Sequence, residues 1–291
     1  MSDIKLFRVV NKKTEEIKGK SVTLERSLQT LIESNMENLL GIRFLATEYS
    51  TGKTHGGRID TLGIDENSCP VIVEYKRSMN ENVINQGLYY LDWLMDHKAE
   101  FELLVLKSID KKTAESIEWS SPRLLCIAGD FTKFDEHAVQ QMNRNIELIR
   151  YMRYGNELLL LELVNATSAA TTAAVGKKEK GKAGAEESKV ATLLAKAGEE
   201  QRDLYESIRV FMLSMGDDVQ EKTLKHYIAF RRIKNFACIE IHPQSKKIRC
   251  FLRINPDSIK LEKGFSRDVS KIGHYGVGDL ELTIKDMSDS E

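Results

Sequence analysis

The sequence has no long apolar run, few cysteines and almost no net charge. No stretch approaches the roughly 20 consecutive apolar residues that a membrane helix needs, and the N-terminus lacks the apolar segment of a secretory signal. The four cysteines are scattered, with no Cys-x-x-Cys spacing. These absences argue against a membrane protein, a disulfide-built domain and a cysteine-based metal site, and they favour a cytoplasmic protein with reduced core thiols.

The net charge of -1 hides an uneven distribution. Residues 1–165 contain 21 Lys/Arg and 25 Asp/Glu, whereas residues 222–271 contain 13 Lys/Arg and only 4 Asp/Glu. A basic block on a nearly neutral protein is either a phosphate-binding surface or a well-solvated face.

The composition predicts two domains, residues 1–165 and 189–291. Residues 166–188 are small, polar and low in complexity, which is typical of a flexible linker. Hydrophobic periodicity predicts a mixed α/β first domain and a small α+β second domain. In the first domain we expect one helix that begins at Ser21 or Thr23 and runs to about Leu39, a helix over 83–95, a helix over 135–143 capped by Asp135, strands over 44–49, 58–64, 71–76, 101–107 and 123–128, and a hairpin over 147–153 and 157–164. In the second we expect helices over 190–197, 203–215 and 220–229, a hairpin over 236–241 and 248–254, and a strand over 280–284.

The most informative segment is a predicted β-hairpin between residues 58 and 76. Two apolar runs flank the polar turn Asp65-Glu66-Asn67-Ser68, so paired positions should sum to about 134 and Asp60 should lie opposite Glu74. Because alternate residues share a face, Arg58, Asp60, Glu74 and Lys76 should gather at one end of one face.

Two facing carboxylates repel each other, so a cation should lie beside them. One alternative is a structural ion-pair cluster with Lys76 or Arg58. The other is a hard divalent cation, which prefers carboxylate oxygens. With a metal bound, Lys76 would be placed to orient or deprotonate a water, as phosphodiester hydrolysis requires.

The arrangement of Asp60 before an apolar strand that ends in Glu74-Tyr75-Lys76 resembles the PD-(D/E)XK phosphodiesterase superfamily. The preceding Gly-Arg-Ile-Asp stretch and the element Gln86-Gly-Leu-Tyr-Tyr90 resemble its NucS-like and RecB-type members. The resemblance covers roughly residues 20–130. It implies a restriction-endonuclease-like mixed sheet flanked by helices. The proline of the superfamily name is replaced by Ile59.

The resemblance also implies roles for individual residues. Asp60 and Glu74 would bind Mg²⁺ or Mn²⁺, with Glu25 of the first helix contributing, although Glu33 and Glu37 are rivals for that place. Lys76 would position the attacking water or the phosphate, and Gln86 would hold the geometry of the site. Arg58, Arg77 and Tyr90 are candidate nucleic-acid contacts, or they only balance charge and pack.

The region from about residue 200 onward resembles a small bacterial domain, domain of unknown function 5655, in its helix start, its strands and its ending His274-Tyr-Gly-Val-Gly-Asp279. Basic and aromatic residues are mixed along its predicted hairpin, which suits nucleic-acid binding but also suits a hairpin with one face in the core. The candidate nucleic-acid contacts here are Arg231, Arg232, Lys234, Lys246, Lys247 and Arg249.

Together these features predict a cytoplasmic, metal-dependent nuclease that acts on DNA, in repair or in defence against foreign DNA. The alternative is a non-catalytic nucleic-acid-binding or regulatory protein on a nuclease-like scaffold. A homodimer would suit an enzyme that cuts both strands, although no residue specifies one.

Overall fold

A computed structural model describes residues 4–20, 25–76, 83–167, 189–286 and 289, except for the side chains of Glu25 and Thr54. The chain forms two compact units, Met1–Thr172 and Ala173–Glu291. Strand β9 ends at Thr167, so it includes the first two residues of the segment expected to be a linker, and residues 168–188 lie outside the description. No helix of the described ranges is long and apolar enough to cross a membrane.

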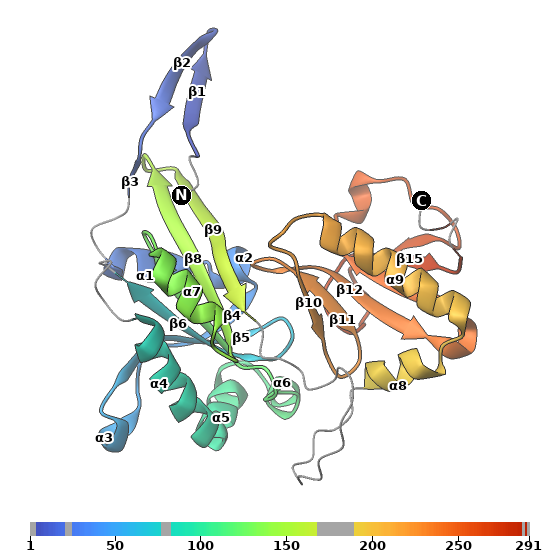
Figure 1. Cartoon of the computed structure of the whole chain (residues 1–291), viewed down its shortest axis with the longest axis horizontal. Coiled ribbons are helices and arrows are strands. Elements are labelled where there is room, and N and C mark those ends of the chain that lie inside the picture. The colour runs from blue at the N-terminus through green and yellow to red at the C-terminus, as the bar shows by residue number, and fades with distance from the viewer. Residues whose placement is uncertain (1–3, 21–24, 77–82, 168–188, 287–288, 290–291) are drawn as a thin grey trace. The chain divides into compact units, whose positions relative to one another are not determined.

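The first unit contains a mixed sheet of seven described strands in the order β3-β8-β7-β6-β5-β4, with β9 beside β8 (Figure 1). Strands β4, β5 and β6 are antiparallel, whereas β6, β7 and β8 are parallel. The strands are β3 (Gly19–Lys20), β4 (Ile42–Ser50), β5 (Arg58–Asp65), β6 (Pro70–Lys76), β7 (Arg123–Ala128), β8 (Asn145–Tyr154) and β9 (Leu158–Thr167). The helices are α1 (Glu25–Glu33), α2 (Met36–Leu40), α3 (Gly52–His55), α4 (Val83–Asp96), α5 (Lys98–Ser108), α6 (Lys111–Glu115) and α7 (Lys133–Gln140).

Helices cover both faces of this sheet, as the sequence predicts for a mixed α/β domain. Leu62, Ile64 and Ile72 pack into one core cluster with side chains from α4, α5 and α7. The neighbouring positions along the strands face the other way, where the Thr61 hydroxyl contacts Glu33 of α1. The predicted alternation is therefore confirmed within the paired part of the hairpin, from Thr61 to Val73. Ile59, beyond the last pair, departs from it and belongs to the same core cluster as Leu62 and Ile64.

Three predicted elements of the first unit differ from the structure. Residues 101–107 are helical, not a strand: Phe101 and Val105, four residues apart, are buried, while Leu103 and Leu106 are 48% and 45% exposed. This spacing is that of one helix face. The expected long first helix is broken into α1 and α2, because the side chains of Ser34 and Asn35 bond to carbonyls of the preceding turn.

The third difference concerns the helix predicted to begin at Asp135. Thr132 is the actual N-cap, and its side chain accepts a hydrogen bond from the backbone N–H of Asp135 at 3.2 Å. The Asp135 carboxylate in turn accepts from the Thr132 backbone N–H at 2.9 Å, which completes a capping box. The helix ends at Gln140.

A two-stranded ribbon of β1 (Leu6–Val10) and β2 (Lys13–Ile17) projects from the first unit and was not predicted (Figure 1). Its Phe7, Val9 and Val10 are 54%, 68% and 55% exposed. Tyr154 of β8 reaches its base by donating to the carbonyl of Ile4 at 3.1 Å.

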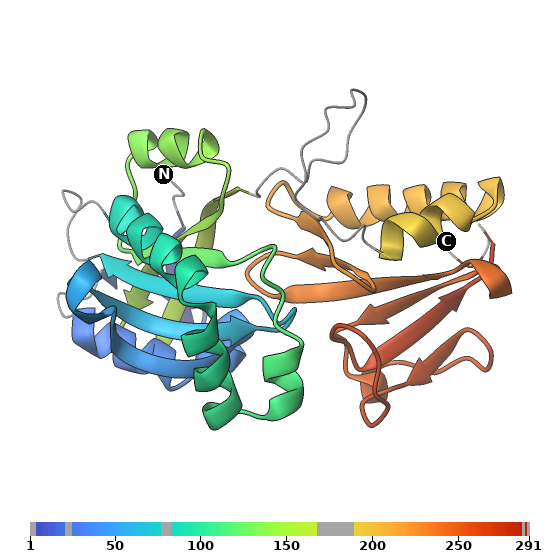
Figure 2. The same ribbon diagram turned by 90° about the horizontal axis from the view of Figure 1, so that it is seen from below.

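The second unit is a six-stranded antiparallel sheet in the order β10-β11-β12-β13-β15-β14, with two helices on one face (Figure 2). Its elements are α8 (Lys189–Lys196), α9 (Glu199–Ser214), β10 (Gln220–Thr223), β11 (Ile228–Arg231), β12 (Asn235–His242), β13 (Lys247–Leu252), β14 (Ser266–Asp268) and β15 (Leu280–Ile284), with short 3-10 turns at Pro243–Ser245 and Pro256–Ser258. The prediction of a helix over 220–229 is wrong, because the strands β10 and β11 form in this part of the chain. Ile228 and Phe230 join the core, and the intervening turn is closed by the Leu224 N–H donating to the Tyr227 carbonyl.

Candidate functional site

The site predicted from the sequence lies where β5 and β6 stop pairing. The ladder runs from Ile64↔Pro70 to Thr61↔Val73, which is the predicted register with positions that sum to 134. Beyond it, the Asp60 backbone N–H donates to Glu74 Oε1 at 3.2 Å, and the Tyr75 backbone N–H donates to Asp60 Oδ2 at 3.0 Å. Each carboxylate thus bonds to the main chain of the neighbouring strand, and we call this reciprocal pair the carboxylate clasp.

Burial and charge distinguish the members of the clasp from ordinary surface acids. Glu74 is 1% exposed, whereas Asp60 is half-buried and closer to solvent. Burial, and then Glu74, raise the pKa of the neighbouring Cys126 thiol well above its ordinary value. Burial also raises the pKa of Tyr75 strongly, with Glu33, Asp60 and Glu74 adding to the effect. Several carboxyl groups therefore surround this strand end.

Lys76 lies two residues beyond Glu74, with a side chain that is only 2% exposed. Its Nζ lies 4.0 Å from Asp135 Oδ2, the acid of the α7 capping box. The sequence predicts a capping role for Asp135, but its place beside Lys76 was not predicted. The signal that was available is the Thr-x-x-Asp spacing, which fixes Asp135 at the third position of α7, although only the fold brings α7 to β6.

Helix α1 supplies further polar contacts. Gln29, 6% exposed, donates from Nε2 to the Asp60 carbonyl at 3.0 Å and to Glu33 Oε1 at 3.1 Å. Glu33 also accepts from the Thr61 hydroxyl at 2.6 Å. The role of Gln29 was not predicted, because no local pattern in the sequence indicates it.

Gln86, Tyr90 and the main chain of Arg58 are linked by hydrogen bonds at the start of β5. Gln86 donates from Nε2 to the Tyr90 hydroxyl at 3.3 Å, and this hydroxyl accepts from the Arg58 backbone N–H at 3.1 Å. Tyr90 is 5% exposed, so it braces β5 rather than presenting its ring to solvent. The Arg58 side chain is 67% exposed and forms an ion pair with Glu48. Arg77 and the Glu25 side chain lie outside the described residues.

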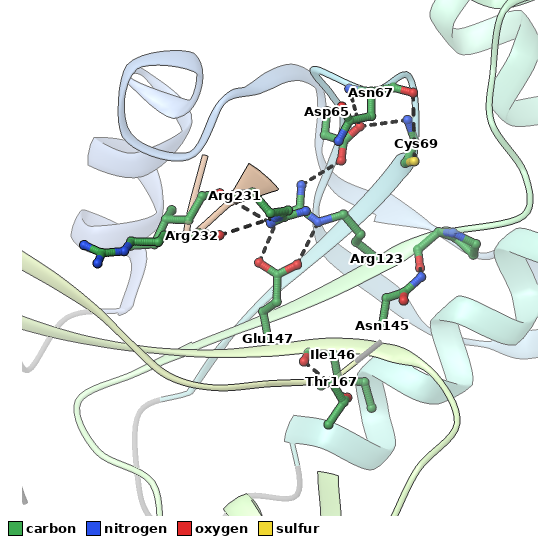
Figure 3. A network of polar contacts seen from close by, with 12 residues as sticks. Asp65, Asn67, Cys69, Arg123, Asn145, Ile146, Glu147, Thr167, Arg231 and Arg232 are labelled. Carbon is green, nitrogen blue, oxygen red and sulfur yellow. Dashed lines mark hydrogen bonds and ion pairs between the residues drawn. The ribbon is translucent and has the colours of Figure 1, made fainter. Parts of the chain in front are cut away.

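A second polar network fixes the turn end of the same hairpin (Figure 3). Asp65 Oδ1 accepts from the backbone N–H groups of Asn67 and Cys69 at 2.9 and 2.8 Å. The Arg123 guanidinium donates to Asp65 Oδ2 and to both oxygens of Glu147, each at 2.8 Å. Burial by itself would lower the pKa of Arg123, but Glu147 and Asp65 raise it above its ordinary value. The network ties β5, β7 and β8 together and so holds the register on which the clasp depends.

The basic residues of the second unit are partly committed to internal contacts. Arg232 pairs with Asp218 at 3.0 Å, and Arg249 Nε lies 3.7 Å from Glu281. Arg231 donates to the carbonyls of Arg232 and Ile233. Lys246 is exposed in the turn after β12, whereas Lys234 and Lys247 are half-buried. The six residues therefore do not all present their charges to solvent.

Among the described residues, no three His, Cys, Asp or Glu side chains are grouped as a metal site. The clasp nevertheless fits Mg²⁺, which is usually held by one or two carboxylates and completes its six positions with water and substrate phosphate oxygens. A structural Zn²⁺ site would need four protein ligands, and Ca²⁺ would need six to eight oxygens. The donor set thus favours a small, hard cation.

Comparison with known proteins supports the predicted character of the C-terminal region. Residues 190–291 match the family described as Domain of unknown function (DUF5655), as the resemblance predicted. Over 292 aligned residues the chain is 29% identical to an uncharacterized protein of Haemophilus influenzae. The alignment covers 97% of this chain and 94% of that protein.

Two solved structures are distantly similar. A repair endonuclease from Pyrococcus abyssi is 16% identical over 45% of this chain, with a TM-score of 0.30. An EndoMS–dsDNA complex is 18% identical over 47% of this chain, with a TM-score of 0.27. The matches span 49% and 48% of those chains, about half their length.

Proposed function

We propose that this chain is a metal-dependent nuclease that hydrolyses phosphodiester bonds in DNA, with Asp60, Glu74 and Lys76 at its centre. The observation that carries the proposal is the carboxylate clasp, because two acids from facing strands are held together by backbone N–H groups, with an amine two residues away. Lys76 lies beside Asp135, and the Arg58 side chain pairs with Glu48. The proposal takes the cation beside Asp60 and Glu74 to be a divalent metal ion, which prefers carboxylate oxygens.

Asp60 and Glu74 would hold Mg²⁺ or Mn²⁺. Such an ion would stabilise charge on a phosphate and supply an activated water. Glu74, with its carboxylate buried, would hold the metal ion in place, while the more exposed Asp60 would face the substrate. The Lys76 ammonium, confined by burial and by Asp135, would hold a phosphate oxygen or the attacking water in place. Gln86 and Tyr90 would keep the start of β5 in position through the Arg58 main chain.

Cleavage of plasmid and single-stranded DNA with Mn²⁺ or Mg²⁺ tests this function. We expect wild-type protein to cut, chelation by EDTA to stop cutting, and Asp60→Asn, Glu74→Gln and Lys76→Met each to lower the rate by at least about a hundredfold. Asp92→Asn removes an exposed acid of α4 and is the matched control, expected to cut at the wild-type rate. DNA binding without metal-dependent cleavage by wild type would instead support a non-catalytic nucleic-acid-binding protein.

A further inference from the structure

The ribbon of β1 and β2 is a basic projection on an acidic unit. Residues 4–20 contain 6 Lys/Arg and 2 Asp/Glu, whereas residues 21–165 contain 15 Lys/Arg and 22 Asp/Glu. The basic side chains of the ribbon and its base are exposed, and within the described part of the chain none of them forms an ion pair. Such a concentration of cations attracts phosphate groups. The side chains are Lys5, Arg8, Lys12, Lys13, Lys18 and Lys20.

The tip of the ribbon carries a cation at a backbone position that favours glycine. Asn11 and Lys12 form the two-residue turn between β1 and β2, with φ angles of 50° and 64°. A hairpin turn with positive φ at both positions matches the twist of the strands, and its second position is usually Gly. Lysine at this position costs backbone stability and places an ammonium group at the outer end of the ribbon (Figure 1).

The base of the ribbon is fixed to β8. The Tyr154 hydroxyl donates to the Ile4 carbonyl, just before β1, at 3.1 Å, and Gly19 pairs with Tyr154 just after β2. A Cβ atom added at Gly19 would collide with the side chains of Met152 and Tyr154, so glycine allows β3 to lie close against them. Both strands of the ribbon are therefore anchored at the end of β8.

The ribbon is anchored at the same edge of the sheet as the candidate site. Strands β6, β7 and β8 run parallel, with Lys76 level with Ala128 and Ala128 level with Arg150. Strand β8 continues beyond that level to Tyr154, where the base of the ribbon is held. A polymer bound to the ribbon would thus be held beside the edge that carries the carboxylate clasp.

The shape of the ribbon suits a groove of duplex DNA. Its five residue pairs, at roughly 3.4 Å per residue, make a ribbon roughly 17 Å long. The major groove is roughly 12 Å wide and admits a two-stranded β-ribbon. Arg8 and Lys13 lie on one face of the ribbon, and the exposed Phe7 and Val9 lie on the other. Apolar side chains can contact thymine methyl groups in that groove, while long basic side chains reach the phosphates.

We propose that the ribbon of β1 and β2 binds duplex DNA in the major groove, with Arg8, Lys12 and Lys13 on phosphates. The inference rests on the proposed function for the identity of the polymer, but it does not depend on a metal ion or on cleavage.

Fluorescence anisotropy of a short labelled DNA duplex, titrated with the full-length chain in EDTA, tests binding without cleavage. We expect the triple variant Arg8→Gln, Lys12→Gly, Lys13→Gln to bind at least about tenfold more weakly than wild type. The slope of log K against log salt concentration should become shallower by about 2–3, because each phosphate contact contributes about 0.9. Lys12→Gly alone should reduce the slope by about 1 and keep the melting temperature, because glycine suits this turn.

A matched variant removes the same charge from the opposite edge of the sheet. Lys107, Lys111 and Lys112 are exposed on α5 and α6. Just after α6, the Glu118 backbone N–H donates to the Ser68 carbonyl, in the turn between β5 and β6, at 2.9 Å. Replacing the three lysines with Gln should leave duplex binding nearly unchanged.

Three results would overturn the proposal: equal weakening by the two triple variants, tighter binding to phosphatidylglycerol vesicles than to duplex, or an equal loss of duplex and single-strand binding in the ribbon variant. The nuclease proposal is tested separately, by cleavage with Mn²⁺. If wild type binds duplex through the ribbon but does not cut, the nuclease proposal fails and this one stands. If wild type cuts but the ribbon variant binds duplex as tightly, only this one fails.

Discussion

At the scale of single residues, the Arg123 guanidinium shows how much of the first unit depends on one buried charge. It is fully enclosed and donates to Asp65 and Glu147, which are 2% exposed each. Removing one partner of such a group leaves the others charged and buried, which costs more than the intact network contributes.

Arg123→Met is therefore expected to lower the free energy of unfolding by about 3–5 kcal/mol, measured by urea denaturation. Lys111→Met is the control, because its ion pair with Glu115 is exposed and should change stability by less than about 1 kcal/mol. Similar losses in the two variants would show that the buried network has no special weight.

The burial of the cysteine thiols leads to a second prediction at the residue scale, which concerns their reactivity. All four cysteines are buried, and burial raises the pKa of Cys250 to about 12. A thiol at that value stays protonated near neutrality, and the thiolate is the reactive form. We expect Ellman's reagent to label the native protein slowly at pH 8 and all four thiols at once in guanidinium.

The raised pKa of Cys250 also makes the stability of the folded protein depend on pH. Because the folded pKa lies above the unfolded value of 9.0, the contribution of the protonated Cys250 thiol to the free energy of unfolding is complete below pH 9 and is lost as the pH rises toward 12. Rapid labelling of native protein at pH 8 would contradict the burial of these thiols.

At the scale of elements, the capping box of α7 connects local sequence to the site. Thr132 and Asp135 satisfy each other's backbone N–H groups, and the same Asp135 faces Lys76. Loss of this cap would destabilise the first turn of α7. The Asp135 carboxylate, and with it the Lys76 amine, would then be held less firmly.

Thr132→Ala is expected to cost about 1 kcal/mol of stability by thermal or urea unfolding. Thr132→Ser retains the hydroxyl and should cost much less. If serine were as damaging as alanine, the loss would arise from the methyl group of threonine and not from the cap.

The elements that could be predicted from the sequence are those whose pattern is local. The hairpin of residues 58–76 has alternating apolar positions and a polar turn, and its register follows from them. Residues 101–107 are apolar nearly throughout, so their periodicity is ambiguous, and burial of Phe101 and Val105 decides the helix. Residues 220–229 are strands because Ile228 and Phe230 pair with β12, which is a contact that no local pattern contains.

The same distinction holds within the candidate site. Asp60, Glu74 and Lys76 share one hairpin, so their proximity follows from strand geometry alone. Gln29 and Asp135 reach the site from α1 and α7, and their places depend on how helices pack on the sheet. Residues far apart in sequence are therefore the part of the site that required the structure.

At the scale of the whole molecule, each of the two compact units has hydrophobic core clusters of its own among the described residues. Ile72 belongs to the core of the first unit and Ile239 to that of the second, and both are fully buried. Compact units with cores of their own can unfold separately, so a single two-state transition is not expected.

Differential scanning calorimetry checks this expectation with a matched pair. Ile72→Val and Ile239→Val each remove one buried methylene and should each cost about 0.5–1.5 kcal/mol. Each variant should lower the midpoint of one transition, by a few degrees, and leave the other in place. A single transition that both variants move equally would mean that the two cores melt as one.

Asp60 and Glu74 are each held by a backbone N–H group, and this determines which substitutions they can tolerate. Asparagine and glutamine each keep a carbonyl oxygen that can accept the N–H now bonded to Asp60 Oδ2 or Glu74 Oε1. Under the proposed function, exchanging one oxygen for an NH₂ group would stop hydrolysis while the hydrogen bonds that position each side chain remain. If nuclease activity is found, such variants would bind the nucleic acid without cutting it and could be used to capture that substrate from cells.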